Sequence, residues 1–281
     1  RTPLVGLQAL ITACGLDDEK IDSETVGFRL APRLNACGRL GHATDAMRLL
    51  TEASPEEAMV LAQQLHEQNG HRQALERTIF EQATAMAEDG GFDRDDRRAI
   101  VLAHESWHPG VVGIVCSRMV ERYGRPTVLL SRQNGVCKGS ARSIDGYSIH
   151  AGIDSGREFL TTFGGHDMAA GLTFSADHLD AFTEKLIAHA NANIAAADLM
   201  PGLHIDCEAG VEELTEDAVK NLQAMSPFGR GNHQPLICIR EAILHEPPRA
   251  VGTQGKHLQL RLRQSAGGRD RWLKAVWFNG G

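Results

Sequence analysis

The sequence lacks the features of membrane and disulfide-rich proteins. Within its 281 residues no apolar run approaches the roughly 18 residues that predict a transmembrane helix. The chain begins with Arg1 and has no secretory-signal layout, and we expect both of its ends to be truncations. The six cysteines include no C-x-x-C pair, which favours free thiols in a cytoplasmic protein over disulfides or a zinc site.

Positive charge is scarce overall but locally concentrated. The formal net charge is −7, which argues against indiscriminate binding to nucleic acid. Residues 249–274 nevertheless carry seven Lys or Arg against one Asp, and residues 118–142 carry six against one Glu. Residues 206–217 carry six acids and no base. Basic patches on an acidic protein favour a defined binding track, although solvated surface charge explains any single patch equally well.

The first fifty residues predict short helices. A helix is expected over 3–14, with Thr2 as its N-cap. Residues 27–41 are basic and contain Pro32 and three glycines, which predicts an irregular segment. A short helix is expected over 43–50.

A much longer helix follows. Ser54, Pro55 and Glu57 form a strong start signal, with a serine cap, a proline in the first turn and a glutamate to close a capping box. Apolar residues at helical spacing continue to about residue 88, and Gly70 is a point at which the helix could bend or split. A helix of this length spans about 50 Å, which predicts a connector between domains.

The remainder predicts an α/β domain and then a small β-barrel. In the α/β domain, strands are expected at 98–103, 126–131, 135–141 and 168–174, and helices at 111–123 and 177–197. The first strand, helix and strand have the lengths of a βαβ unit. After residue 200, strands are expected at 203–207, 236–244, 256–263 and 271–278, with a helix at 215–225. Residues 257–263 alternate strictly between polar and apolar, as half-buried antiparallel strands do.

A first candidate site lies on one predicted strand. Lys138, Ser140 and Arg142 would project to the same face, and their ammonium, hydroxyl and guanidinium groups suit the binding of phosphate. Ser143 adds a second hydroxyl. The alternative is an exposed strand edge that binds nothing.

A second candidate lies about twenty residues further on. Gly164 and Gly165 precede His166, so the backbone there can approach a ligand closely. A lone histidine is more often a satisfied structural residue, and no further metal ligand stands at a suitable spacing nearby. We therefore predict no metal site in this chain.

Two weaker candidates have equally good structural explanations. Arg33 and Arg39 flank Asn35 in a segment that could bind phosphate or could be held by carboxylates. In the last domain, aromatic residues lie near cations, an arrangement that stacks bases but also arises in a core. The aromatic residues are Phe228, Trp272, Trp277 and Phe278, and the cations are Arg230, Arg261, Arg263, Arg271 and Lys274.

Five motifs together resemble a known family. They are RLAPRLNACGRLGHA (29–43), WHPGVVGIV (107–115), KGSARS (138–143), FGGHDMAAG (163–171) and PFGRGN (227–232). They stand in the order found in the bacterial single-stranded-DNA-specific exonucleases of the DHH phosphoesterase superfamily. The chain resembles the C-terminal half of such a protein over essentially its whole length.

The resemblance implies a domain plan. Its parts are the end of a DHH catalytic domain at 1–53, a connecting helix at 54–91, a DHH-associated substrate-binding domain at 92–200 and a truncated OB-like nucleic-acid-binding domain at 201–281. The fold class is therefore α/β, with a mixed sheet and helices, plus a small OB-like β-barrel. The long helix joins these parts to the end of the DHH domain.

The resemblance also implies site residues. The substrate-facing residues would be Arg33, Asn35, Arg39, Lys138, Ser140, Arg142, Ser143, Gly164 and Gly165, with His166 as a supporting residue at the wall of the cleft. Among these, Ser140 and Arg142 would hold a 5′-terminal phosphate. The nucleic-acid track would be Arg261, Arg263, Arg271 and Lys274.

The implied activity is 5′-to-3′ exonuclease digestion of single-stranded DNA in repair and recombination in the cytoplasm. Mn²⁺ or Mg²⁺ would be held by the DHH domain, and a single-strand-binding protein and a helicase would be partners. The sequence departs from the family because it contains no Asp-His-His and no Asp-x-Asp before the first helix. The fragment alone should therefore not hydrolyse DNA. The alternatives are a DHH-type phosphodiesterase of short oligonucleotides or cyclic dinucleotides, and a non-catalytic single-strand-binding module.

Overall fold

The computed structural model describes residues 2–92, 94, 96–199, 202–229, 231–266 and 268–280. The chain divides into two compact units, Arg1–Pro201 and Gly202–Gly281. Arg230, one of the cations expected beside aromatic residues, lies outside the described residues. No helix in the described ranges is both long enough and apolar enough to cross a membrane.

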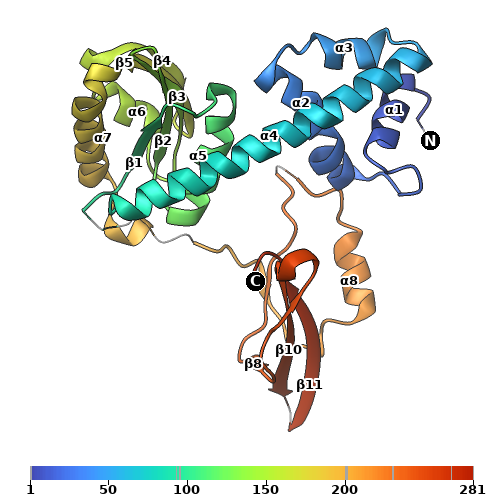
Figure 1. The fold of residues 1–281 in the computed structure, drawn as a ribbon. Helices are drawn as coiled ribbons and strands as arrows, with labels where there is room; N and C mark the ends of the chain where they lie inside the picture. Colours follow the sequence, from blue (N-terminus) through green and yellow to red (C-terminus); the bar gives the residue numbers. More distant parts are fainter. Residues whose placement is uncertain are drawn as a thin grey trace. The chain divides into compact units, whose positions relative to one another are not determined.

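The first unit begins with a helical bundle around the amino-terminal half of one long helix, α4 (Pro55–Asp89). The helices packed against α4 are α1 (Val5–Ala13), α2 (Ala31–Leu40) and α3 (Thr44–Thr51), and a π-helical segment (Thr25–Leu30) leads into α2 (Figure 1). Their apolar side chains form one core, in which Leu10, Leu49 and Leu65 are fully buried.

Most of the segment at 27–41, predicted to be irregular, is helical, and only Gly41 lies beyond the end of α2. The π-helical segment continues directly into α2, and Pro32 lies at their junction, in the first turn of α2. Ala36 and Cys37 are buried on the side of α2 that packs on α4. Tertiary packing therefore outweighs the weak local helix propensity of this segment.

The start of α1 also differs from the prediction. The helix begins at Val5 rather than Pro3, and its N-cap position is Leu4, which offers no capping side chain. The hydroxyl of Thr2 accepts a hydrogen bond from the Leu4 amide at 3.2 Å, so Thr2 stabilises the turn before the helix instead of capping it.

The predicted long helix is confirmed as a single element of 35 residues. The Ser54 hydroxyl accepts a hydrogen bond from the Glu57 amide at 3.3 Å, as a serine N-cap should. The Glu57 carboxylate accepts a hydrogen bond from Arg48 instead of completing the capping box. Gly70 neither ends nor divides the helix.

The second half of the first unit is a five-stranded sheet between two helical layers. Its strands are β1 (Ile100–His104), β2 (Thr127–Gln133), β3 (Val136–Arg142), β4 (Leu160–His166) and β5 (Ala169–Ser175). They pair in the order β1-β2-β3-β5-β4, with β1 parallel to β2 and all other neighbours antiparallel. α5 (Pro109–Tyr123) connects the parallel pair, which confirms the predicted strand–helix–strand unit.

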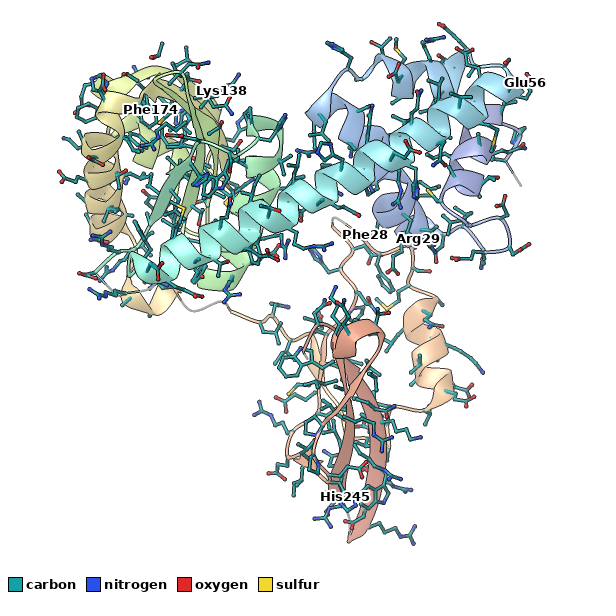
Figure 2. All side chains as sticks on the ribbon, viewed as in Figure 1. Phe28, Arg29, Glu56, Lys138, Phe174 and His245 are labelled. Carbon is teal, nitrogen blue, oxygen red and sulfur yellow. The ribbon has the colours of Figure 1, made fainter. Side chains whose placement is uncertain are left out.

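The sheet is packed on both faces (Figure 1). α5 and the carboxy-terminal half of α4 share one core with it, which contains Ile79 and Val115. α6 (Ile149–Asp154) and α7 (Leu179–Asn193) lie against the other face, where Phe174 and Phe182 are fully buried with their ring centroids 4.9 Å apart (Figure 2).

β4 and α6 were not predicted, and the predicted helix over 177–197 is shorter. β4 is an edge strand in which most side chains are exposed, so its sequence shows no alternation between apolar and polar residues. α6 has only six residues, too few for a recognisable helical period. α7 is flanked by 3₁₀ turns (Ala176–His178 and Ala196–Leu199), which account for the ends of the predicted helix.

Among its described residues, the second unit contains one α-helix, α8 (Glu216–Gln223), a 3₁₀ turn (Thr253–Gly255) and strands of two to ten residues. Its strands are β6 (Cys207–Glu208), β7 (Ile237–Cys238), β8 (Ile243–Leu244), β9 (Arg249–Val251), β10 (His257–Ala266) and β11 (Arg269–Trp277). β10 pairs antiparallel with β11, β8 and β9, while β6 and β7 form a separate parallel pair. Over the described residues the ladders thus form two small sheets, and the predicted strand at 236–244 is two short strands.

Candidate nucleic-acid interface

β3 carries three candidate phosphate-binding side chains on one face. Cys137 and Ala141 are buried in the core shared with α7. Lys138, Ser140 and Arg142 therefore project to the opposite face, on which α5 packs, as the alternation of a strand predicts. Lys138 is exposed (Figure 2), whereas Ser140 and Arg142 are half-buried.

The strand register aligns this motif with the glycine–histidine motif. The rows across β3, β5 and β4 are Lys138–Thr173–Thr162, Ser140–Gly171–Gly164 and Arg142–Ala169–His166. Directly paired residues of antiparallel strands lie on the same face of a sheet, so each row presents its side chains together. The middle residues of the last two rows are Gly171 and Ala169, so no bulky side chain separates β3 from β4 there. We call these nine residues the β3–β5–β4 shelf.

The two glycines of β4 differ in whether the fold could accept a larger residue in their place. A Cβ on Gly165 would lie 2.4 Å from the Ala169 carbonyl oxygen, and its φ of +151° is one that other residues rarely adopt. The fold itself therefore requires glycine at position 165. A Cβ on Gly164 would meet no described atom within 4 Å. The space beside Gly164 is open, and its role in leaving room for a ligand stays a prediction.

His166 is exposed at the end of the shelf. Within the described part of the chain its side chain makes no hydrogen bond, ion pair or ring contact, although its backbone pairs with Ala169. Its imidazole is therefore free to contact a substrate, and the structure gives it no core-stabilising role. This is consistent with its prediction as a supporting residue.

Arg142 has no carboxylate partner among the described residues. Its Nη1 donates to the Ala141 carbonyl oxygen at 2.8 Å, which leaves other N–H groups of the guanidinium unoccupied. Beneath it, the Cys116 thiol of α5 donates to the Ser140 carbonyl oxygen at 3.1 Å and so ties the helix to β3. Burial raises the pKa of Cys116 to about 12, although the nearby Arg142 charge acts in the opposite direction.

Ser143 differs from its neighbours. It is buried, and its hydroxyl donates to the Tyr147 carbonyl oxygen at 2.6 Å. Its amide donates to the Met168 carbonyl oxygen at 3.1 Å. Ser143 therefore holds the chain after β3 against the end of the β4–β5 hairpin, which is a structural role rather than the predicted contact with substrate.

The three candidates on α2 are placed differently from one another. Asn35 is exposed. Arg33 donates from Nη1 to the Arg29 carbonyl oxygen at 2.6 Å, while its Nε is buried without a partner among the described residues. Arg39 is exposed and donates to the carbonyl oxygen of Gly110, in the first turn of α5, at 3.3 Å. This contact joins the helical bundle to the α/β part of the same unit.

A further arginine, which lies near Arg33 and Arg39, was not predicted from the sequence. Arg72 of α4 is buried, donates to Asn69 at 2.9 Å and pairs with Glu76. Desolvation lowers its pKa, and the charges of Arg39 and Arg33 add to that effect, while Glu76 opposes it. The sequence carries a signal for this site, since Asn69, Arg72 and Glu76 continue the helical spacing of the core positions of α4 with polar side chains.

In the second unit, three of the four predicted track residues share a face. Arg261 is opposite Lys274, and Arg263 is opposite Trp272, all on the same side of the β10–β11 pair. The Trp272 ring is about half exposed and meets His245 edge to face, with centroids 4.5 Å apart. This face therefore presents cations next to an aromatic ring.

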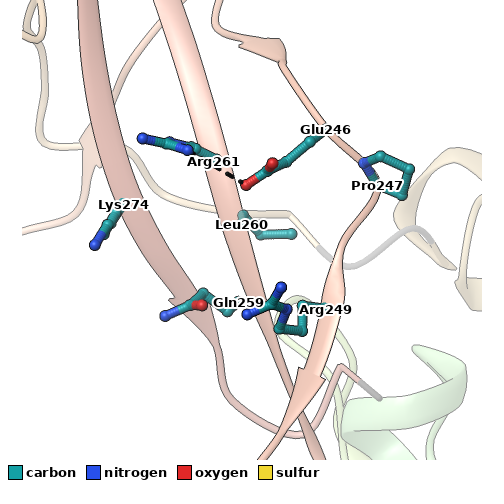
Figure 3. A pocket seen from close by; sticks show the side chains of 7 residues that line it. All are labelled: Glu246, Pro247, Arg249, Gln259, Leu260, Arg261 and Lys274. Atoms are coloured by element: carbon teal, nitrogen blue, oxygen red, sulfur yellow. Dashed lines mark ion pairs between the residues drawn. The ribbon is translucent and has the colours of Figure 1, made fainter.

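Arg271 departs from the prediction, because it pairs with Gln264 and projects to the opposite face of the sheet. Arg249, which was not predicted, pairs with Gln259 and joins the basic face. Arg249, Arg261 and Lys274 line a cavity of about 350 Å³ (Figure 3). The ion pairs of this face, Arg261–Glu246 at 3.8 Å and Arg263–Asp270 at 3.2 Å, are exposed and therefore weak.

The side chains around the shelf do not form a metal-binding set. Among the described residues, no group of three or more His, Cys, Asp or Glu side chains is arranged to hold a metal ion. The shelf offers an ammonium, a guanidinium and hydroxyls, which suit an anion, and His166 is the single shelf side chain of a type that commonly binds a divalent metal. The six cysteines are free thiols, as predicted; three of them are buried, and Cys207 is exposed.

Family models match two segments of the chain. A DHHA1 domain matches residues 96–192, and a RecJ OB domain matches residues 205–281. A DHHA1 domain followed by a RecJ OB domain is an arrangement of the DHH phosphoesterase class. Over these two domains the chain corresponds to a C-terminal segment of a RecJ protein.

Similar proteins match almost the whole chain. The single-stranded-DNA-specific exonuclease RecJ of Bacillus subtilis is 37% identical over 283 residues, and that of Escherichia coli is 30% identical over 280 residues. The chain spans 35% and 48% of these two proteins. The crystal structure of Thermus thermophilus RecJ with Mg²⁺ superimposes with a TM-score of 0.79 at 28% identity, covering 98% of this chain and 46% of that one.

Proposed function

We propose that the full-length protein is a 5′-to-3′ single-stranded-DNA exonuclease of cytoplasmic DNA repair and recombination. Within it, these 281 residues bind the DNA strand and its 5′-terminal phosphate. The observation that carries the proposal is the register of the β3–β5–β4 shelf, in which Ser140 and Arg142 stand in rows with Gly164 and His166. The names of the similar RecJ proteins support the choice of substrate.

The shelf suits a terminal phosphate for three reasons. The Arg142 guanidinium has donors to spare and Ser140 offers a hydroxyl, and both bind phosphate oxygens well. Lys138 adds an exposed charge at the rim. Gly171 and Ala169 have small side chains or none, so a nucleotide can approach the surface between β3 and β4. His166 then supports the substrate from the far strand.

The divalent metal of the reaction belongs elsewhere in the full-length protein. The solved RecJ structures are described as complexes with Mg²⁺ or Mn²⁺. We propose that this protein also uses Mn²⁺ or Mg²⁺ and that aspartates and a histidine outside this chain bind it. When bound, the metal would activate water for attack on phosphorus. The residues of this chain would position the strand and would not hydrolyse DNA alone.

The basic face of the second unit would guide the rest of the strand. Arg249, Arg261, Arg263 and Lys274 supply charge for the phosphates, and Trp272 supplies a ring on which a base can stack. We also propose a single-strand-binding protein as the partner that presents the strand, and a helicase as the partner that produces it.

End-labelled strands test the proposal. Full-length protein with Mn²⁺ should degrade single strands carrying a 5′-phosphate from that end. Arg142→Ala should lower kcat/KM for those strands by about 10- to 100-fold, as expected for loss of a charge-assisted hydrogen bond. Arg132→Ala, which removes an exposed cation paired with Glu105 on the same sheet, serves as a control and should change little. Unchanged activity of Arg142→Ala would refute the assignment of the phosphate site.

A second candidate function is cleavage of short oligonucleotides or cyclic dinucleotides by a DHH-type phosphodiesterase. The RecJ OB match over 205–281 counts against it, because a strand-guiding domain has no purpose for a substrate of a few nucleotides. A third is a non-catalytic single-strand-binding module. Comparing turnover of dinucleotides and of long strands separates the two enzymes, and absence of any turnover by the full-length protein would favour the binding module.

A further inference from the structure

The motif at residues 107–115 has no role in the function proposed so far. It forms the start of α5, where the His108 imidazole caps the helix by accepting from the Gly110 amide at 3.1 Å. Gly110 and Gly113 follow within the helix and, being three residues apart, lie on one side of it. Neither has a positive φ, so conformational freedom does not explain them. Glycine weakens a helix, so another reason is required.

Both glycines are explained by a neighbouring group that leaves too little room for a Cβ. The neighbouring group is different for each of them. A Cβ on Gly110 would lie 2.2 Å from the backbone carbonyl oxygen of Arg39. A Cβ on Gly113 would instead face side chains, at 3.1 Å from the Ser140 hydroxyl and 3.4 Å from Nη2 of Arg142. Gly110 thus permits the packing of α2 on α5, whereas Gly113 stands against the two proposed phosphate ligands.

The helix cannot retreat from β3 to make room for a larger residue. Val112 and Val115 of α5 are fully buried in the core beneath the sheet. The Cys116 thiol also donates to the Ser140 backbone at 3.1 Å. A methyl group at position 113 would therefore displace the Ser140 hydroxyl by a few tenths of an ångström and would lie in van der Waals contact with the Arg142 guanidinium. Hydrogen bonds to phosphate weaken steeply when donors leave their ideal positions.

We infer that Gly113 is a specificity residue for the 5′ end of the strand. It gives Ser140 and Arg142 the room to turn toward a terminal phosphomonoester, and so it sets the preference for a phosphate over a hydroxyl end. This inference rests on the proposed function, since it assigns the ligand of the same shelf. Gly113 acts through its two neighbours and is a positioning residue, not a catalytic one.

The test uses full-length protein and two strands that differ only in a 5′-phosphate or a 5′-hydroxyl. The readout is the ratio of kcat/KM for the two strands. Gly113→Ala should lower this ratio about tenfold, as for one weakened hydrogen bond to a charged group. Gly70→Ala is the matched control, because its Cβ meets nothing within 4 Å, and it should keep the ratio. Gly110→Ala should slow both strands by a similar factor.

The outcomes separate the inference from the proposed function. If Ser140→Ala and Arg142→Ala lose the preference but Gly113→Ala keeps it, the inference alone is wrong. If all three variants keep the preference for a 5′-phosphate, both the proposed phosphate site and the inference about Gly113 are wrong. If Gly113→Ala folds poorly, the ratio is measured in a Gly70→Ala, Gly113→Ala double variant, in which the first change strengthens α4 without touching β3.

Discussion

Arg142 and His166 lie on the same face of the sheet, in register across β5, with only Ala169 between them. They are far apart in the sequence and were predicted as parts of separate motifs. The hydrogen-bond register of three antiparallel strands turns them into opposite margins of one shelf. A substrate held by Arg142, as proposed, would therefore lie within reach of His166.

The first prediction concerns His166. Because it is exposed and has no partner in the described structure, His166→Ala should change the free energy of unfolding by less than about 0.5 kcal/mol. In the full-length enzyme it should lower kcat about tenfold or more, as loss of a supporting contact in the transition state does. The Mn²⁺ concentration for half-maximal activity should stay the same. A large shift in that concentration would instead make His166 a metal ligand, and Thr161→Ala, on the same strand but outside the shelf, is the control.

The second prediction separates the two glycines of β4. Gly165→Ala should destabilise the protein by about 2 kcal/mol or more, because the new Cβ would clash with Ala169 at a φ that favours glycine. Gly164→Ala should cost little stability but should weaken binding of strands with a 5′-phosphate. Urea unfolding and strand binding measured on both variants check this, and equal loss of stability in the two would contradict it.

The third prediction concerns the two faces of the β10–β11 pair. Arg261→Ala should weaken strand binding and reduce the slope of log K against log salt by about 0.7, the effect of one lost contact with single-strand phosphate. Arg271→Ala removes the same charge from the opposite face and should leave the slope closer to that of the wild type. Equal changes in the two slopes would show that the DNA strand does not bind preferentially to one face of the β10–β11 pair.

The fourth prediction tests base stacking at Trp272. If a base stacks on the exposed part of this ring, Trp272→Ala should cost about 1–3 kcal/mol of strand-binding free energy with little change in salt dependence. Trp272→Phe should restore part of the loss. Fluorescence quenching of the wild-type protein by a single strand gives an independent measurement, although Trp107 and Trp277 also contribute to the signal and must be subtracted with single variants.

The fifth prediction follows from the pKa of Cys116. The folded-state pKa of about 12 exceeds the usual value of 9.0, so the native state keeps a proton that the unfolded state loses. The associated stability is complete below pH 9 and disappears as the pH rises toward 12. Cys116→Ala should be less stable at neutral pH because of the cavity, but its stability should fall less steeply above pH 9. Urea midpoints from about pH 8 to the alkaline limit provide the comparison.

The parts of the fold that were predicted have strong local signals. α4 begins with a serine cap and a proline, and its apolar spacing continues for about nine turns. The β1–α5–β2 unit is bounded by clear turn residues, including Gly124 in the left-handed conformation at the end of α5. In both cases, neighbouring residues carry the information, so a single sequence is enough.

The parts that were missed depend on distant residues. β4 is recognisable only through its pairing with β5, since an edge strand with glycines has no alternation of its own. The segment at 27–41 is helical because α4 buries one side of it. Alternation within β11 already separates Arg271 from Lys274, but only the register between β10 and β11 shows which of the two shares a face with Arg261.

The candidate site shows the same division. Alternation within β3 was enough to place Lys138, Ser140 and Arg142 on one face, which the burial of Cys137 and Ala141 on the other face bears out. The motif alone could not show that Ser143, one residue further, turns into the fold to bond Tyr147. Nor could it reveal the approach of Gly113, which lies on a different element and comes near Ser140 only after the helix packs on the sheet.

The long helix α4 has a consequence for how the first unit unfolds. Its first half supplies Leu61 and Leu65 to the core of the helical bundle, and its second half supplies Ile79 and Ala83 to the core beneath the sheet. Loss of either core would leave half of the helix unpacked, and an isolated helical segment of that length is only marginally stable in water. The two cores should therefore melt together in one cooperative transition. Leu65→Ala, in the bundle, should lower the melting temperature of the sheet as well.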